Sequence, residues 1–394
     1  MKICVFNPGV VHAVPRTIAF AKFFHEVHYF DMKGMDSRKL LEKNGIIYYA
    51  PFKDGKNTFN SVRLQKMLPH IAPDGIICHF AYGGHFSNSI LYNKCPVAVI
   101  AMGHDILYAE GDGVVSPLAR LLIRMGLRRA DYISAKSNRL KERIESYGTK
   151  KIIHVNYWGA DTSLFKQQDK HECRKYLGLP LNIPIILSPR AVEPLLNIHL
   201  IVESFCAIRE KYPEARLVVL GRTHKEYRKK IEDFIQGKTI ERSIDLVYEV
   251  SEDSLIKYYN ASDAIVSVAK SDGFPNAVLE AMSCMRPIVV GKILHIEELL
   301  KDKYNARLCD ITVQGISDSL IDVLDNQEKY KKIAEAGYDT VKQYGDIKVN
   351  GERFASVFNE IILRSRGRKR SMLNNLPFWC VFVADFMDRR LFGR

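Results

Sequence analysis

The sequence predicts an α/β protein built on two parallel β-sheets, each covered by helices. Short apolar runs rich in Val and Ile alternate with longer stretches of helical period, which is typical of repeated βαβ units. The first series of runs covers 3–6, 26–30, 45–49, 75–80, 96–102, 132–135 and 151–155. The second covers 184–188, 215–220, 244–248, 264–268 and 287–290. We therefore expect two Rossmann-like, doubly wound domains.

A polar segment separates the two series. Residues 156–165 follow neither a helical nor a strand period, so we place the domain junction there. The predicted domains are then 1–160 and 161–364, with a basic amphipathic extension over 365–394. A chain of 394 residues is long enough for two domains with separate cores.

The composition is that of a globular protein, because 47% of the residues are hydrophobic and 26% are charged. Disordered and fibrous classes are excluded. Eight cysteines are scattered without close pairing and mostly lie in apolar runs, which favours reduced core residues of a cytoplasmic protein. The first apolar run is too short for a signal-peptide core, and no uncharged run approaches the ~20 residues of a membrane span.

The formal net charge of +13 favours contact with polyanions. Charge alone does not choose between nucleotides, nucleic acids and anionic lipids. The sequence has neither a zinc-finger spacing nor a basic region followed by heptads, so we expect no nucleic-acid partner.

The segment 271–290 carries the most specific signal in the chain. It places an acidic, Gly- and Pro-containing loop after a buried strand and before a helix that begins at Pro275 and Asn276. Such loops lie at the carboxyl edge of a parallel sheet, where helix N-termini bind phosphate. Glu280 follows about 6 Å along the helix axis. It is either an ordinary solvated residue or, with Asp272 eight positions earlier, part of a site that supplies a hydroxyl or cation partner.

This segment resembles the signature of the family 4 retaining glycosyltransferases, which read Glu-Gly-Phe-Pro, then Leu-Glu-Ala-Met, then Pro-Val/Ile before a strand. In that family two acidic residues separated by seven others handle the nucleotide-sugar donor. The resemblance implies that Asp272 contacts sugar hydroxyls and that Glu280 holds the ribose hydroxyls. Asp stands here where the common pattern has Glu, which bears on the identity of the sugar.

The resemblance covers roughly residues 1–364 and implies the GT-B architecture, with donor and acceptor meeting in a cleft between two Rossmann-like domains. The segment 156–165 is similar to the family's interdomain Asn-Gly-Val-Asp-x-x-x-Phe stretch. Gly221 is similar to the turn beneath the nucleotide, and Gly9 is what remains of a Gly-Gly loop under the donor phosphates. The predicted donor-binding residues are Gly9, Arg190, Gly221, Lys270, Gly273, Phe274, Pro275, Asn276 and Glu280.

Cationic side chains are the expected partners of the leaving diphosphate, because no Asp-x-Asp metal motif stands at a plausible strand end. We expect no metal ion and no cofactor. Arg190 follows the first strand of the second series and matches the Arg of the family's Gly-Arg-x-x-x-x-Lys pattern. Leu195 occupies the Lys position, and Lys270 is a candidate substitute. The alternative is that Arg190 and Lys270 are plain surface residues.

In the first domain, His104 and Asp105 follow the strand 96–102 and resemble the family's His-Gly-Ser-Asp-Ile loop near sugar and acceptor. The resemblance implies a catalytic role for His104, beside Asp272 and Arg190, and an acceptor-side position for Asp105. His79 ends another strand and is a second acceptor-side candidate. A loop histidine with a structural role is the alternative.

Two basic segments suggest contact with an anionic membrane surface. After Arg364 the chain carries a cluster of basic residues and then the aromatic stretch 376–383, which predicts an interfacial helix. The alternative is that this extension packs on the first domain. Arg120, Arg124 and Arg128 share one face of another amphipathic helix, although its leucines are also suited to packing on the sheet.

The sequence and this resemblance therefore predict a cytoplasmic, peripheral and metal-independent glycosyltransferase, and the resemblance implies a retaining mechanism. It would transfer sugar from a nucleotide-diphosphate sugar to a glycan or lipid-linked acceptor, in cell-surface polysaccharide or glycolipid synthesis. Two alternatives remain at this point. One is a nucleotide-sugar epimerase with similar twin domains, and the other is a non-catalytic protein that binds sugar nucleotides.

Overall fold

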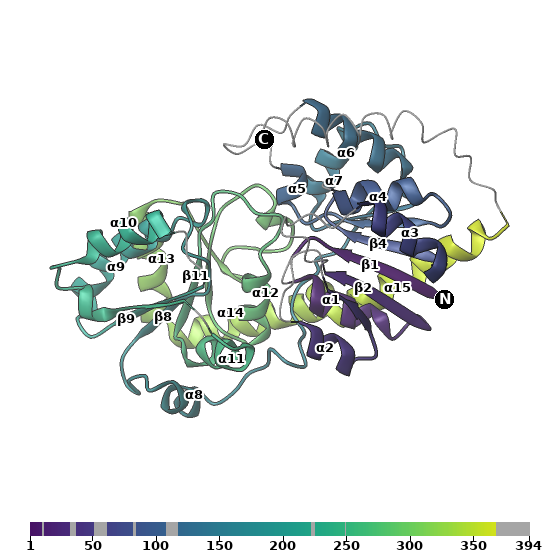
Figure 1. Cartoon of the computed structure of the whole chain (residues 1–394). Helices are drawn as coiled ribbons and strands as arrows, with labels where there is room; N and C mark the ends of the chain where they lie inside the picture. The colour runs from purple at the N-terminus through teal and green to yellow at the C-terminus, as the bar shows by residue number, and fades with distance from the viewer. Residues whose placement is uncertain are drawn as a thin grey trace. The chain divides into compact units, whose positions relative to one another are not determined.

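The computed structural model divides into two compact units, Met1–Trp158 with Ile347–Arg394, and Gly159–Asp346 (Figure 1). It describes residues 1–9, 12–31, 37–50, 61–81, 84–107, 117–221, 225–248 and 250–367, with the backbone alone at 61–63, 84–85, 87–88, 104, 107 and 117–119. We call the two units unit 1 and unit 2 and describe each by itself.

Unit 1 contains a seven-stranded parallel sheet in the order β3-β2-β1-β4-β5-β6-β7. Its strands are β1 (Lys2–Asn7), β2 (Glu26–Asp31), β3 (Ile47–Tyr49), β4 (Gly75–His79), β5 (Val97–Ile100), β6 (Tyr132–Ala135) and β7 (Ile153–Val155). Its helices are α1 (Ala13–Ala21), α2 (Arg38–Lys43), α3 (Ser61–Ile71), α4 (Gly84–Tyr92), α5 (His104–Leu107), α6 (Pro117–Arg129), α7 (Asn138–Glu145) and α15 (Ile347–Ser365). Every strand of the first predicted series is present.

Unit 2 contains a six-stranded parallel sheet in the order β10-β9-β8-β11-β12-β13. Its strands are β8 (Ile185–Ser188), β9 (Arg216–Leu220), β10 (Ile244–Val247), β11 (Ala264–Ser267), β12 (Ile288–Gly291) and β13 (Arg307–Cys309). Its α-helices are α8 (Lys170–Leu177), α9 (Ile198–Lys211), α10 (Lys225–Ile235), α11 (Glu252–Ala261), α12 (Asn276–Ser283), α13 (Val313–Asp325) and α14 (Gln327–Thr340). Shorter helical turns are η2 (Pro194–Leu196), η3 (Glu241–Ser243), η4 (Ile296–Glu298) and η5 (Val341–Gly345).

The strand β13 is absent from the predicted series, because three residues are too few to show a strand period. It pairs with β12 through Val289↔Arg307 to Gly291↔Cys309 and so completes the edge of the sheet.

The adjacent strands β8 and β11 mark the point in the sheet of unit 2 where the strand order reverses. The chain builds outward from β8 to β9 and β10 on one side, and from β11 to β12 and β13 on the other. The adjacent β8 and β11 run parallel, with Ala264 opposite Ile186 and Ile265 opposite Leu187. Loops that leave these two carboxyl ends turn in opposite directions, and ligands of open α/β sheets bind at such a point.

The boundary of unit 2 differs from the predicted one at its C-terminal end. The prediction assigned 161–364 to the second domain, whereas α15 belongs to unit 1 and packs beside α1 (Figure 1). The physical reason is its apolar face: Phe354 and Phe358 are fully buried, and Phe354 contacts Phe20 with the two ring centroids 5.2 Å apart. Gly351 permits the close approach, since an added Cβ would lie 3.0 Å from the carbonyl carbon of Ala19. Burial against a distant element leaves no local trace in the sequence.

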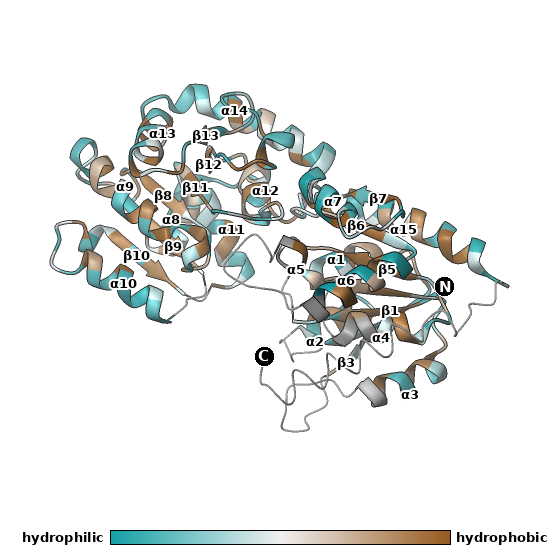
Figure 2. Cartoon of the chain, turned by 90° about the horizontal axis from the view of Figure 1, so that it is seen from above, coloured by the Kyte–Doolittle hydropathy of each residue, from teal (hydrophilic) through white to brown (hydrophobic). Residues whose placement is uncertain are grey.

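The cores follow the strands, which carry the apolar residues, while the polar faces of the helices turn outward (Figure 2). Among the seven cysteines in the described residues, six are buried and Cys206 is partly buried, and all are free thiols, as predicted. In the described part of the chain, no helix has both the length and the apolar character that crossing a membrane requires. The predicted interfacial stretch 376–383 lies outside the described residues.

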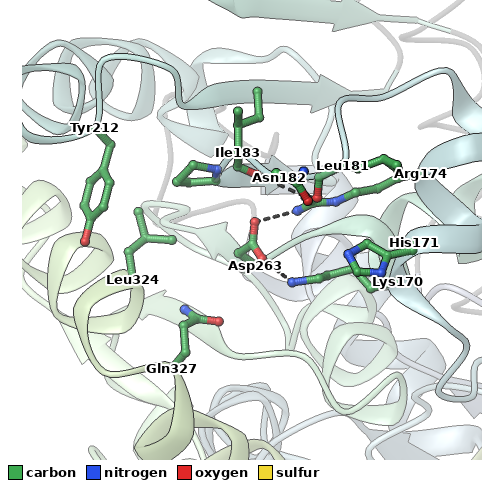
Figure 3. A pocket seen from close by; sticks show the side chains of 11 residues that line it. Lys170, His171, Arg174, Leu181, Asn182, Ile183, Tyr212, Asp263, Leu324 and Gln327 are labelled. Carbon is green, nitrogen blue, oxygen red and sulfur yellow. Dashed lines mark hydrogen bonds and ion pairs between the residues drawn. The ribbon is translucent and has the colours of Figure 1, made fainter.

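At the amino edge of unit 2, Asp263 binds three partners next to a pocket of about 320 Å³ (Figure 3). It accepts hydrogen bonds from the Arg174 guanidinium at 2.6 Å, the Ile185 backbone N–H at 2.7 Å and the Lys170 ammonium at 2.9 Å. Arg174 is 1% exposed and also donates to the carbonyl oxygens of Ala261, Leu181 and Ile183. The cluster joins α8, β8 and β11 at the edge opposite the loops that follow the strands.

We predict that Asp263→Ala lowers the free energy of unfolding of unit 2 by about 3 kcal/mol, because it leaves the buried Arg174 charge uncompensated. Lys170→Ala serves as the control. It removes a partner whose side chain is 36% exposed and is expected to cost less than about 1 kcal/mol. Urea denaturation followed by far-UV circular dichroism measures both changes. Equal losses in the two variants would contradict this role for the buried pair.

Candidate active site

The predicted donor residues of unit 2 come together at the carboxyl edge of its sheet. Arg190 lies in the loop after β8, Gly221 directly follows β9, and 270–275 lie in the loop between β11 and α12. Pro275 is the extended N-cap of α12, with φ −73° and ψ 123°, and Asn276 is its first residue. Because β8 and β11 are neighbours, their loops bring Arg190 and Asp272 to the same place.

Arg190 and Asp272 form an ion pair across these two loops. Arg190 Nη2 donates to Asp272 Oδ2 at 2.6 Å, and the side chains are 14% and 20% exposed. A charge-assisted hydrogen bond of this length is short, and partial burial protects it from screening by salt. Both side chains keep some exposure to solvent, so an incoming anion can compete with Asp272 for the guanidinium.

Glu280 is half-buried on α12 and has the hydroxyl partner that its position requires. Its Oε2 accepts a hydrogen bond from the Tyr259 hydroxyl at 2.7 Å. Tyr259 lies on α11 and is fully buried, with its ring 6.0 Å from that of Phe165. Burial, and after it the charge of Glu280, raise the pKa of Tyr259 well above its usual value. The tyrosine therefore stays protonated and fixes the direction of the carboxylate.

The loop between β11 and α12 is anchored by its own apolar residues. Gly273, Pro275 and Asn276 are buried, and Phe274 is 0% exposed. The Phe274 ring thus belongs to the core, and we assign it the task of holding the loop. Lys270 stands at the start of the loop and is exposed.

Gly221 allows the loops after β9 and β8 to touch. Its φ is +129°, and an added Cβ would lie 3.0 Å from both Cα and N of Ala191, the residue after Arg190. A side chain at this position would combine backbone strain with displacement of the Arg190 loop. In unit 1, Gly9 also has a positive φ of +96°, and its N–H donates to Asn7 Oδ1 at 3.2 Å.

The acceptor-side candidates lie at the carboxyl edge of unit 1. His79 ends β4 and is 0% exposed. Asp105 is 5% exposed and accepts three backbone hydrogen bonds, from Ala81 at 2.7 Å and from Met102 and Gly103 at 3.0 Å each. Burial raises the pKa of Asp105, and the backbone donors oppose that shift. Asp105 therefore joins the loops after β4 and β5, which favours a positioning role over direct contact with an acceptor.

His104, the predicted catalytic residue of unit 1, begins α5, and its side chain lies outside the described residues. Sequence reasoning missed three polar residues near the donor edge. Tyr259 is one, and Ser188 and Asn197 are the others, with Ser188 Oγ and Asn197 Oδ1 buried and without a hydrogen-bond partner in the described structure. Ser188 ends β8 and Asn197 donates to Val268 O at 2.8 Å, so both lie at the β8/β11 switch point. Position at a strand end was the available signal for Ser188.

Comparison with known proteins gives the family. The model for glycosyl transferases group 1 matches residues 169–340, and the model for glycosyl transferase 4-like proteins matches residues 2–137. The chain belongs to the family 4-like, GT-B glycosyltransferases. The two matched ranges fall in unit 2 and unit 1 respectively. The signature at 271–290 thus lies within the group 1 match.

Relatives of this glycosyltransferase are distant in sequence. N-acetyl-α-D-glucosaminyl L-malate synthase of Bacillus anthracis is 20% identical over 303 residues, 76% of each chain. An uncharacterized glycosyltransferase of Methanocaldococcus jannaschii is 21% identical over 310 residues, 77% of this chain and 81% of that protein. The α-monoglucosyldiacylglycerol synthase of Streptococcus pneumoniae is 22% identical over 200 residues, 50% of this chain and 45% of that one.

Solved structures share the fold along almost the whole chain. Anabaena HepE, in complex with UDP and glucose, has a TM-score of 0.78 and 18% identity and covers 91% of this chain and 100% of its own. Sucrose-phosphate synthase of Thermosynechococcus elongatus has a TM-score of 0.80 and 12% identity, covering 93% of this chain and 100% of its own. These neighbours establish the GT-B fold for this glycosyltransferase.

We predict that Tyr259→Phe raises the KM for the sugar donor about fivefold and leaves kcat within about twofold, because Glu280 loses the hydrogen bond that orients it. Steady-state kinetics with varied donor measure the effect. Tyr258→Phe, one residue earlier on the same helix, is the matched control and should match the wild type. A Tyr259→Phe enzyme with unchanged KM would show that Glu280 needs no such orientation.

Proposed function

We propose that this glycosyltransferase takes a nucleotide-diphosphate sugar as donor in unit 2 and transfers the sugar without a metal ion and with retention of configuration. The observation that carries the proposal is the Arg190–Asp272 ion pair at the β8/β11 switch point. It is supported by Anabaena HepE, which has the same fold and was solved with UDP and with UDP-glucose.

In this proposal the diphosphate displaces Asp272 from the Arg190 guanidinium. Arg190 then stabilises the charge that develops on the leaving phosphate, and Asp272 becomes available to accept hydrogen bonds from sugar hydroxyls. Glu280, held by Tyr259 at 2.7 Å, is aimed at the ribose hydroxyls. The amino end of α12 adds the partial positive charge of a helix N-terminus.

The transfer breaks the bond between the anomeric carbon and the phosphate oxygen and forms a bond from that carbon to the acceptor hydroxyl. In the retaining mechanism that we propose, the leaving phosphate takes up the acceptor's proton on the same face of the sugar. The protein then contributes mainly position and charge stabilisation. Asp105 would serve by fixing the loops of unit 1 that carry His104, the proposed acceptor-side catalytic residue.

For the acceptor we propose a glycan or a lipid-linked molecule, in polysaccharide or glycolipid synthesis at the cytoplasmic face of a membrane. The similarity to a glycolipid synthase of Streptococcus pneumoniae supports this class. Exposed Arg120, Arg124 and Arg128 on α6 are suited to a peripheral association with anionic lipid. Nothing in the site favours an epimerase, which would convert the donor without any acceptor.

We predict that Arg190→Ala lowers kcat about 100-fold, as expected for the loss of a charge-stabilising donor at the leaving group. Glu280→Gln should instead raise the KM for the donor about tenfold, because a neutral amide accepts ribose hydroxyl hydrogen bonds less strongly. Product formation from a panel of nucleotide sugars is measured by chromatography, with Arg242→Ala, an exposed arginine of η3, as the control. Wild-type rates in both site variants would refute the assignment.

We predict that removing divalent metal ions with EDTA leaves the initial rate within about twofold of the untreated enzyme, because Arg190 supplies the charge that a metal ion would otherwise provide. The same preparation assayed with added Mg²⁺ or Mn²⁺ is the comparison. A loss of activity on chelation that either ion restores would show that the transfer depends on a metal.

A further inference from the structure

We propose that Lys270 binds the diphosphate of the donor, delivering from the loop after β11 the second positive charge that the loop after β8 lacks at Leu195. This inference rests on the proposed function, since it assigns the phosphate-binding charges of that same site. Its basis is the position of Lys270, its lack of a carboxylate partner in the described structure, and a direct backbone contact with Leu195.

The loop after β8 brings one cation to the site. Between Arg190 and the start of α9 the only other charged residue is the exposed Glu193, and Leu195 is partly buried in η2. Arg190 is already paired with Asp272, so one positive charge faces one carboxylate before any ligand arrives. A diphosphate carries at least two negative charges. Any second cationic side chain at this site therefore comes from a different element.

Lys270 is placed beside the position where that charge is missing. Its backbone N–H donates to the carbonyl oxygen of Leu195 at 2.9 Å, which fixes the start of the β11–α12 loop against η2. Two residues further on, Asp272 bonds Arg190 at 2.6 Å. Two contacts thus join the loop after β8 to the loop after β11. Arg190 lies on the first of these loops and Lys270 on the second.

The ammonium group of Lys270 is available to a ligand. Lys270 is exposed and forms no ion pair within the part of the chain that the structure describes. Some lysines of unit 2 are paired with carboxylates, such as Lys211 with Asp325 and Lys292 with Asp310. Lys270 is exposed beside the β8/β11 switch point and has no carboxylate partner in the described structure. Its ammonium group can therefore bind an anion.

His199 lies near Lys270 and is held by Tyr227. The Tyr227 hydroxyl accepts from the His199 backbone N–H at 3.0 Å and lies 2.7 Å from His199 Nδ1. The Tyr227 hydroxyl therefore holds both the backbone and the ring of His199 in place. Burial lowers the pKa of His199, Glu203 opposes the shift and the charge of Lys270 adds to it. Because its pKa is lowered, His199 is neutral near pH 7. Of these two residues, Lys270 carries the positive charge.

The test compares binding of UDP with binding of uridine, which has the same base and ribose but no phosphate. Isothermal titration of the full chain is carried out on the wild type and on Lys270→Ala, Lys270→Arg and Lys331→Ala. Lys331 is exposed on α14 and controls for the change in net charge. We expect Lys270→Ala to bind UDP about tenfold more weakly and uridine equally well, while Lys270→Arg and Lys331→Ala stay within about threefold of the wild type.

A relocation variant makes the inference sharper. Leu195→Lys in the Lys270→Ala background puts a lysine on the opposite loop, next to the same backbone contact. We expect it to restore most of the lost UDP affinity. Three results would each overturn the role of Lys270. The first is equal UDP affinity in Lys270→Ala and wild type, and the second is a loss of uridine affinity as large as the loss of UDP affinity in Lys270→Ala. The third is that neither Lys270→Arg nor Leu195→Lys in the Lys270→Ala background binds UDP more tightly than Lys270→Ala.

A different result would refute the proposed function itself. A wild-type chain that binds neither UDP, GDP nor ADP more tightly than the matching nucleoside would refute the nucleotide-diphosphate donor, and the role of Lys270 with it. A wild-type chain that prefers one diphosphate, together with an unaffected Lys270→Ala variant, would refute Lys270 alone. If GDP or ADP is the preferred diphosphate, the variants are compared with that nucleotide and its nucleoside.

Discussion

The donor side of this glycosyltransferase depends on one constraint, namely that β8 and β11 are adjacent and parallel while the chain continues from them in opposite directions. Their loops must start next to each other and then diverge, which leaves room for a ligand between them. The Arg190–Asp272 ion pair and the bond from the Lys270 N–H to the Leu195 carbonyl both cross this point. Each joins the β8 loop to the β11 loop, so the geometry of one loop determines that of the other.

The same sheet carries an arginine–aspartate pair at each edge, and burial gives the two pairs different tasks. At the amino edge Arg174 is 1% exposed and its guanidinium also donates to three carbonyl oxygens. Nothing can replace Asp263 there without leaving a buried charge, so that pair is structural. At the carboxyl edge Arg190 and Asp272 lie in the loops after β8 and β11, and their side chains are 14% and 20% exposed. In the function that we propose, a phosphate of the donor replaces the carboxylate of this pair.

Sequence patterns predicted the parts of the fold that repeat locally. All strands with at least four residues in unit 2, the helix start at Asn276 and the need of Glu280 for a polar partner were visible as periods and loop chemistry. The identity of that partner was not, because Tyr259 lies 21 residues from Glu280 and looks like any aromatic residue on an amphipathic helix. The return of α15 to unit 1 and the bonding of Asp105 by backbone N–H groups were equally hidden. Both arise from tertiary contacts between segments far apart in the chain.

Two departures of this chain from the family's patterns lie at the contacts between the β8 loop and the β11 loop. Leu195 stands where the family's Gly-Arg-x-x-x-x-Lys pattern has Lys, and its carbonyl oxygen accepts a hydrogen bond from the Lys270 backbone N–H. Asp272 stands where Glu is common, and its shorter side chain still reaches Arg190 at 2.6 Å. In the donor site that we propose, the shorter acid would leave more room for the sugar, and Lys270 on the β11 loop would keep a positive charge near the phosphates. Because the loops are joined at these residues, the substitutions are expected to act as one unit, and each is best understood together with its partner across the site.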